Sequence, residues 1–169
     1  FEKTGIFGDI SLVSMPEIFL KDFWADTDYQ EEGTLQITAE ADLGGRKEPV
    51  QLRVLLTDPK DKKQLVWGEQ EITAEDPKLR LTFPVPEARP WSTETPVLYE
   101  LTLQLFQKGE FLEEYRTHIG FRRIKREGTQ VLWNGVPLKL RGICYREPLG
   151  EEERFLETDL RLFKEAGVN

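Results

Sequence analysis

LQITAEADL, residues 35–43, is the stretch of sequence that decides the fold. Its apolar side chains occupy every second position, and polar side chains occupy the positions between them. Because successive side chains of a β-strand point to opposite faces, this alternation predicts a strand with one buried face and one solvated face. Such a strand needs a second apolar layer to cover it.

The same alternation recurs through the first 125 residues, interrupted by turn residues such as Gly44-Gly45 and Asp58-Pro59. Seven or eight antiparallel strands in this length predict an all-β, immunoglobulin-like sandwich. The cysteine pair of antibody domains is absent, so the likeness is one of architecture. The segments predicted as strands lie near residues 10–15, 18–28, 34–43, 49–57, 63–73, 79–85, 98–107 and 111–124.

The remainder of the chain has a different pattern. Asn134-Gly135 favours the positive φ angles of a tight hairpin turn between Gln130–Trp133 and Val136–Tyr145. A helix is predicted over Glu152–Ala166, and Gly167 suits its C-terminal end. A strand, a loop and an amphipathic helix in this order are typical of the first unit of a parallel α/β domain. The apolar face of the helix is formed by Phe155, Leu156, Leu160 and Phe163.

Composition excludes several classes of function. The chain has 23 Lys and Arg against 31 Asp and Glu, a net charge of −8, which argues against nucleic acid or an anionic membrane as partner. One cysteine and one histidine are too few for the usual transition-metal sites, so we expect no metal and no cofactor. No apolar stretch approaches the roughly 20 residues of a membrane span, and no signal pattern is present. We expect a soluble protein, for which cytoplasm and periplasm fit equally well.

Several separated segments together resemble glycoside hydrolase family 2, the family of β-galactosidases, β-glucuronidases and β-mannosidases. The order of the segments also matches that family. They are GIFGDI at 5–10, PWS at 90–92 followed by TPVLYEL at 95–101, IGFR at 119–122, NGVPL at 134–138 with LRG at 140–142, and DL at 159–160 with KEAGVN at 164–169.

The resemblance implies a retaining glycosidase with a jelly-roll domain, an immunoglobulin-like domain and a catalytic (β/α)₈ barrel. Residues 1–9 would end the jelly-roll domain or form a linker, 10–125 would form the sandwich, and 126–169 would contribute the first hairpin, strand and helix of the barrel. The chain begins with Phe1 and ends directly after a helical pattern, so we expect an excerpt of a longer enzyme. Its predicted function is structural, because both catalytic glutamates of the family would lie beyond residue 169. The alternative is an independent carbohydrate-binding or adhesion module.

The resemblance places candidate substrate contacts at the mouth of the barrel, where the intact enzyme would bind carbohydrate. They are Arg141, Cys144, Arg146 and Glu147. Arg146 stands where many members of the family have histidine, and Cys144 where many have asparagine. The forked donors of arginine suit sugar hydroxyls or a carboxylate, but Arg146 equally suits a salt bridge with Glu147 or a helix acid. Cys144 has no activating base nearby in the sequence, and we interpret it as a small buried filler.

The aromatic residues have two interpretations. Arg122, Trp91 and Tyr99, from the family-like segments, are assigned to the junction between domains. Trp24 and Trp67 lie in predicted strands, where large aromatics usually anchor a core or an interface. The alternative hypothesis for the tryptophans is a surface platform on which a sugar ring stacks.

Neighbouring glutamates do not make a catalytic pair here. Retaining hydrolysis needs two carboxyl groups about 5 Å apart, whereas Glu113 and Glu114 are consecutive in a predicted strand and point to opposite faces. We interpret both as solvated surface residues. The face of Leu156, Leu160 and Phe163 needs a cover, and we expect it to fold back on the sandwich or to pair with a second copy.

Overall fold

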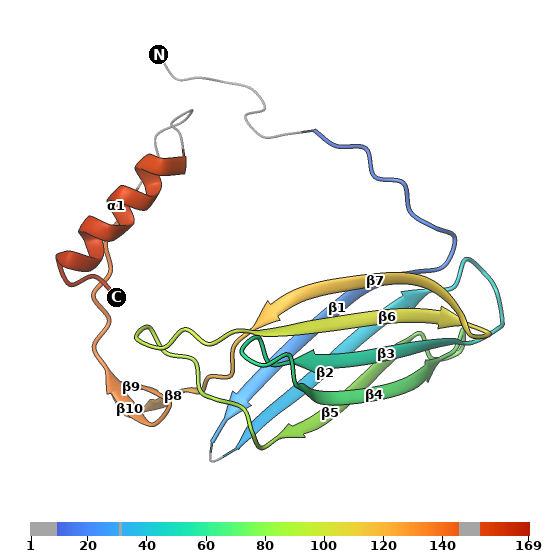
Figure 1. The fold of residues 1–169 in the computed structure, drawn as a ribbon, viewed down its shortest axis with the longest axis horizontal. Helices are drawn as coiled ribbons and strands as arrows, with labels where there is room; N and C mark the ends of the chain where they lie inside the picture. Colours follow the sequence, from blue (N-terminus) through green and yellow to red (C-terminus); the bar gives the residue numbers. More distant parts are fainter. Residues whose placement is uncertain (1–9, 31, 146–152) are drawn as a thin grey trace.

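The computed structural model describes residues 10–30, 32–145 and 153–169, with side chains from residue 156 onward in the last range, and Figure 1 shows two facing antiparallel sheets. One sheet has the order β1-β2-β5, formed by β1 (Phe19–Tyr29), β2 (Gly33–Asp42) and β5 (Lys78–Val85). The other has the order β4-β3-β6-β7, formed by β3 (Val50–Thr57), β4 (Gln64–Ile72), β6 (Tyr99–Gln107) and β7 (Glu110–Ile119). This is the predicted immunoglobulin-like sandwich.

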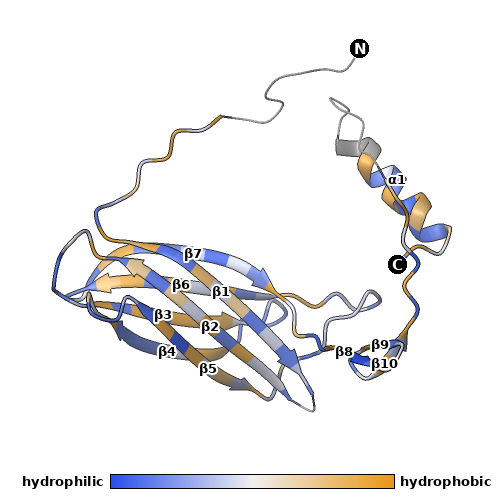
Figure 2. Ribbon diagram, turned by 180° about the vertical axis from the view of Figure 1, so that it is seen from behind, coloured by the Kyte–Doolittle hydropathy of each residue, from blue (hydrophilic) through white to orange (hydrophobic). Residues whose placement is uncertain are grey.

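Alternate side chains of both sheets fill the space between them. In β2 every second residue from Gly33 to Ala41 is buried, and β3 follows the same rule from Val50 to Leu56. Figure 2 shows the resulting alternation of apolar and polar residues along the strands. The two sheets also meet at their edges, where the backbone amide of Leu20 in β1 donates to the carboxylate of Glu113 in β7. The fully buried large side chains are Tyr99, Phe121, Leu35, Ile37, Leu52, Leu56, Ile72, Leu101, Leu103, Leu105, Val50 and Val54.

The strand predicted at residues 10–15 is wrong. This segment has no secondary structure, and Leu12 is fully exposed, with Ile10, Val13 and Met15 exposed to 82%, 69% and 46%. No strand among the described residues pairs with this segment. Its apolar sequence therefore does not belong to the core of the sandwich.

The last predicted strand, 111–124, is two separate elements. β7 ends at Ile119, and β8 (Ile124–Glu127) joins β9 (Gln130–Trp133) and β10 (Val136–Leu138) in a small sheet of order β10-β9-β8. The predicted turn is confirmed, because Asn134 and Gly135 have φ angles of 50° and 83°. The strand expected to continue to Tyr145 ends at Leu138, since β9 pairs with it over three residues only.

The helix α1 (Glu153–Glu165) is one residue shorter at each end than predicted, and Gly167, whose φ is 88°, caps it as predicted. The amide of Gly167 donates to the carbonyl of Lys164 (3.0 Å) and that of Val168 to the carbonyl of Phe163 (3.0 Å), which is a Schellman cap. Figures 1 and 2 show that α1 lies apart from both sheets of the sandwich. None of the helical structure in the described ranges is long and apolar enough to cross a membrane.

The expectation that the helix folds back on the sandwich is wrong. The helix packs instead on the segment that leads to it: the Tyr145 hydroxyl donates to Asp159 (2.6 Å), and the Tyr145 ring meets Phe163 edge to face at 5.1 Å. This contact covers part of the apolar face, whereas Leu160 stays 55% exposed. Pairing of the face with a second copy stays a prediction.

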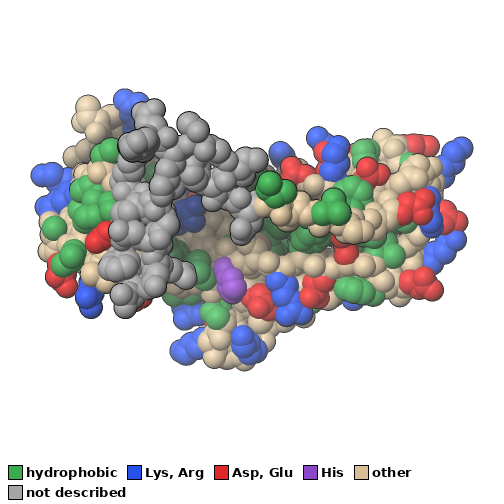
Figure 3. Space-filling view, turned by 90° about the horizontal axis from the view of Figure 1, so that it is seen from above, with side chains coloured by type: hydrophobic (Ala, Val, Ile, Leu, Met, Phe, Trp, Pro, Cys, Tyr) green, Lys and Arg blue, Asp and Glu red, His purple; other side chains and the backbone are tan. Residues whose placement is uncertain are grey.

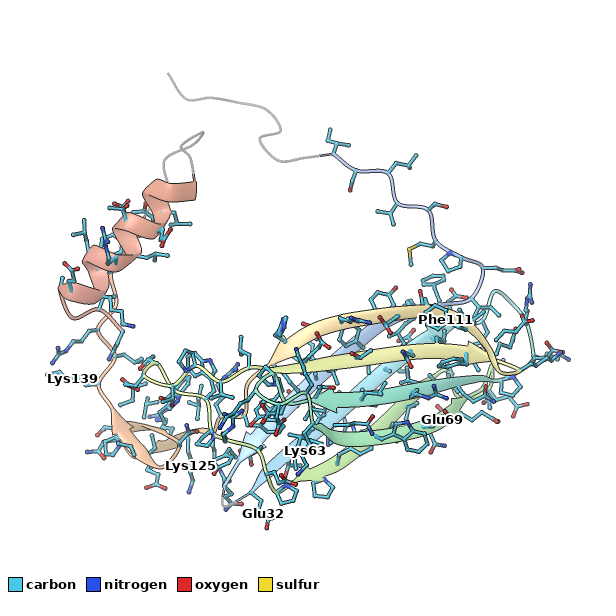
Figure 4. All side chains as sticks on the ribbon, in the orientation of Figure 1. Glu32, Lys63, Glu69, Phe111, Lys125 and Lys139 are labelled. Atoms are coloured by element: carbon cyan, nitrogen blue, oxygen red, sulfur yellow. The ribbon has the colours of Figure 1, made fainter. Side chains whose placement is uncertain are left out.

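Many charged side chains on the outside of the molecule form ion pairs. Acidic and basic groups are interspersed on the face in Figure 3, and Figure 4 labels several of them around the sandwich and the small sheet. Lys63 contacts Glu87 at 2.5 Å, and Lys125 contacts Glu127 at 2.8 Å. Such exposed pairs contribute little to stability, so apolar burial holds the fold together.

Truncating a core side chain tests this account. We expect Leu52→Ala to lower the free energy of unfolding by about 2–5 kcal/mol, because it leaves a cavity between the sheets. Leu12→Ala, which changes the same residue type at a fully exposed position, is the matched control and should change it by less than about 0.5 kcal/mol. Urea unfolding of both variants measures the difference, and equal effects would contradict the placement of the core.

Candidate functional site

One end of the sandwich carries a compact junction with the small sheet, which we call the Trp91 junction (Arg89–Trp91, Tyr99, Gly120–Arg123, Trp133 and Asn134). The loop after β5 and the exit from β7 meet here, because Pro90 and Phe121 form a parallel β-bridge. The backbone amide of Trp91 donates to the carbonyl of Phe121 at 2.7 Å. The PWS and IGFR segments of the sequence are thereby brought side by side.

Trp91 connects the sandwich to the small sheet. Its ring lies 5.4 Å from that of Trp133 at an interplanar angle of 53°. Its carbonyl accepts hydrogen bonds from the Trp133 indole (3.2 Å) and from the Asn134 side-chain amide (3.0 Å). Both tryptophans are half-buried, so the contact combines apolar area with satisfied polar groups.

Asn134 has two functions at the junction. Its positive φ makes the β9–β10 turn, and its side-chain oxygen accepts from the backbone amide of Arg123 at 2.8 Å. The backbone amide of Asn134 donates to the carbonyl of Arg123, also at 2.8 Å. The turn therefore fixes the strand that leaves the sandwich as well as closing the hairpin.

Tyr99 supports the junction from inside the core. Its ring is fully buried and meets Phe121 edge to face at 5.4 Å. Its hydroxyl accepts from the backbone amide of Arg89 at 2.7 Å, and the Arg89 guanidinium binds both oxygens of the Asp58 carboxylate at 2.7 and 2.8 Å. The Tyr99 hydroxyl, followed by Asp58, raises the pKa of Arg89. The hydroxyl group of the buried Tyr99 therefore has a hydrogen-bond partner.

Gly120 permits the close approach of Trp91. A Cβ atom at this position would lie 2.9–3.1 Å from three atoms of the Trp91 side chain. The Gly120 carbonyl accepts from the Thr27 hydroxyl at 2.9 Å, which links the same point to β1. A side chain here would have to displace the tryptophan or the strand.

The structure separates the sequence-predicted site residues into two groups. Trp91, Tyr99 and Arg122 all belong to the junction, where the Arg122 side chain is exposed. Arg141 and Cys144 lie together on the segment that leads to α1, where Arg141 contacts Asn169 through its backbone. Arg146 and Glu147 lie outside the described residues, as does most of the GIFGDI segment. The interpretation of Cys144 as a buried filler is wrong, because its side chain is exposed.

A groove of about 480 Å³ opens at the edge of the sandwich, between the ends of β1 and β7. Its lining includes Trp24, Asp26, Leu98, His118, Arg122 and Ile124. Sequence reasoning missed this site because it interpreted Trp24 as a core or interface anchor, whereas the side chain is 65% exposed. The alternation of β1 could have predicted this exposure. Phe23 and Ala25 face the core, so Trp24 between them lies on the solvated face.

Glu113 and Glu114 lie on opposite faces of β7 and outside the groove, as the strand period predicts. Both are half-buried rather than fully solvated. Glu113 binds the Leu20 amide, and Glu114 accepts from Gln104 (2.7 Å) and Arg116 (2.6 Å), which lower its pKa in that order. These carboxylates therefore act as structural acceptors.

No group of three or more His, Cys, Asp or Glu side chains within the described ranges is arranged to hold a metal ion.

The close contact at Gly120 yields a prediction. We expect Gly120→Ala to destabilise the chain by about 1–3 kcal/mol, because the new methyl group overlaps the Trp91 side chain. Gly142→Ala is the matched control, since nothing lies within 4 Å of the point that its new methyl group would occupy. Urea unfolding measures both variants.

The double variant Gly120→Ala/Trp91→Ala tests whether the clash with Trp91 causes the destabilisation expected for Gly120→Ala. If the clash with the tryptophan is responsible, the two substitutions destabilise by less than the sum of their separate effects. Strict additivity would contradict the contact.

Comparison with known proteins identifies relatives of this architecture. The family model described as glycosyl hydrolases family 2 matches residues 18–122, which include both sheets of the sandwich and part of the junction. A β-galactosidase of Enterobacter cloacae is 28% identical over the whole chain, and the chain spans 18% of its length. The β-galactosidase large subunit of Latilactobacillus sakei is 30% identical over 87% of the chain, which spans 23% of that subunit.

Solved structures show the same fold. A family 2 member from Bacteroides cellulosilyticus superposes on 90% of the chain with a TM-score of 0.78 and 21% identity, and the chain covers 23% of it. A β-glucuronidase from Ruminococcus gnavus superposes on 92% with a TM-score of 0.70 and 23% identity, with 26% of that protein covered. The chain thus spans about a fifth to a quarter of the length of these relatives.

Proposed function

Because the chain belongs to glycosyl hydrolase family 2, we propose that it is the non-catalytic sandwich portion of a larger retaining glycosidase. Its role is to hold the catalytic barrel in a fixed position relative to a preceding jelly-roll domain. The observation that carries this proposal is the Trp91 junction, where the outgoing strand is held by hydrogen bonds to Asn134 and Trp91. A strand held in this way transmits a fixed direction to whatever follows it.

Exposed apolar residues before and after the sandwich support the proposal that further domains pack against it. On the N-terminal side, Ile10, Leu12 and Val13 expose most of their surface. On the C-terminal side, Leu160 and Leu162 of α1 are exposed to 55% and 52%. Apolar surface of this kind is typical of residues that pack against another part of a protein. The division into 1–9, 10–125 and 126–169 remains our proposal, with the first boundary moved toward β1 because residues 10–15 lie outside the sandwich.

The candidate substrate contacts fit this arrangement. Arg141 and Cys144 are exposed on the segment between the small sheet and α1. In a barrel, the end of the first strand opens into the active-site mouth. Arg146 and Glu147 follow two and three residues after Cys144 in the sequence and remain proposed contacts with a carbohydrate substrate.

The reaction proposed for the complete enzyme is hydrolysis of a terminal β-glycoside with retention. That chemistry uses one carboxylate as nucleophile and a second as acid and base. The family places both glutamates on later strands of the barrel, so residues 1–169 supply neither. The chain contributes rigidity and position, and by itself it should not hydrolyse glycosides.

Comparing the complete gene product with residues 1–169 tests the proposal. We expect the complete protein to hydrolyse at least one of the p-nitrophenyl β-galactoside, β-glucuronide and β-mannoside, and the 1–169 chain to release no p-nitrophenol from any. Proton NMR of the first product formed should show the β-anomer, as retention requires. Hydrolysis by the short chain, or an inverted first product, would overturn the proposal.

A further inference from the structure

We propose that the groove between β1 and β7 is a binding site for a pyranose sugar, which stacks on Trp24. This goes beyond the bracing role, because the groove is built from residues other than Trp91, Trp133 and Asn134. In Figure 3 the protein's one histidine, coloured purple, marks this face of the molecule. The groove volume of about 480 Å³ lies within the range of small-molecule sites.

Trp24 supplies a fixed aromatic surface. Its side chain is 65% exposed, and its indole nitrogen donates to the Asp26 carboxylate at 2.8 Å. This hydrogen bond holds the ring in one orientation before a ligand arrives, which lowers the entropic cost of binding. A pyranose ring has an apolar C–H face that suits an aromatic plane, and large aromatics give contact area with few rotatable bonds.

The polar groups around Trp24 suit sugar hydroxyls. Asp26 offers acceptor oxygens, Arg122 offers up to five N–H donors, and His118 offers ring nitrogens. Arg122 and His118 are exposed at the mouth of the groove rather than committed to the core. A sugar hydroxyl both donates and accepts, so it can use this mixture, whereas a purely apolar ligand would leave these groups unpaired.

The surroundings favour a sugar over a polyanion. The chain carries a net charge of −8, and Asp26 and Asp28 lie on the exposed face of β1 near Trp24. A phosphate backbone needs several cations close together, and the groove lining includes one arginine, Arg122. Leu98 and Ile124, exposed to 42% and 58%, add apolar walls without making the groove wholly apolar.

The test is a titration of ¹⁵N-labelled chain with lactose, D-mannose and D-glucuronate, followed by NMR. We expect saturable shifts of the Trp24 indole N–H and of the amides of Ala25, His118 and Gly120, with dissociation constants in the region of about 1–10 mM. Absence of saturable shifts with all three sugars up to about 100 mM would overturn the proposal.

Two tryptophans provide a matched comparison. Trp24→Ala should weaken binding by about tenfold or more, whereas Trp67→Ala should leave it unchanged, because Trp67 is similarly exposed (57%) on β4 and lies outside the groove. Trp24→Phe keeps an aromatic face but loses the hydrogen bond to Asp26, so it should bind more weakly than the parent chain and more tightly than Trp24→Ala. Equal losses in Trp24→Ala and Trp67→Ala would contradict the proposed position of the site.

Arg122→Gln distinguishes neutral from acidic sugars. If Arg122 pairs with a carboxylate, the substitution weakens the binding of glucuronate by about tenfold more than it weakens the binding of lactose. An equal loss for both sugars assigns Arg122 to hydroxyl groups, whereas unchanged affinity for both would contradict the placement of Arg122 in the site.

Repeating the titration on the complete gene product distinguishes failure of the sugar site from failure of the proposed bracing role. Saturable shifts of the Trp24 indole N–H in both proteins support the sugar site, because Trp24 lines the groove. Binding by residues 1–169 alone would mean that another domain fills the groove, and it would overturn the proposal while leaving the bracing role intact.

Discussion

Burial of one face of each sheet of the sandwich is the constraint on which the rest of the structure depends. Neither sheet can leave its apolar face in water, so each covers the other, and alternate residues of β2, β3 and β6 become fully buried. This packing determines which side chains remain outside. The exposed position of Trp24 is a direct consequence, because its neighbours Phe23 and Ala25 occupy the inner face.

The two ends of the described chain differ in how tightly they join this core. At the Trp91 junction, backbone bonds, an aromatic pair and the Asn134 side chain fix the small sheet. Residues 10–15 and α1 make no comparable contact with the sheets, and they keep apolar surface exposed. The rigid connection on one side and the exposed apolar surface beyond it are the observations behind the proposal that the chain is one portion of a larger enzyme.

The same edge of the sandwich brings together residues that are far apart in the sequence. Trp24 and Asp26 come from β1, His118 from β7, and Arg122 from the exit toward the small sheet. No local pattern connects them, because the strands that carry them belong to different sheets and meet only where β1 approaches β7. The binding groove and the bracing junction therefore lie side by side: they share Gly120 and Arg122, whereas Trp24 belongs to the groove and Trp91 to the junction.

The sequence by itself determined the strands between residues 18 and 119, the Asn134-Gly135 turn, the helix and its Gly167 cap, because period, turn chemistry and capping are local properties of the chain. The family-like segments were also readable without coordinates. Only the tertiary structure decided that residues 10–15 are not part of the core, that Cys144 and Trp24 are exposed, and that α1 packs on the Tyr145 segment. An apolar residue in the sequence shows a tendency to be buried, but whether a partner surface lies within reach depends on how the sheets and the segments around them are arranged in space.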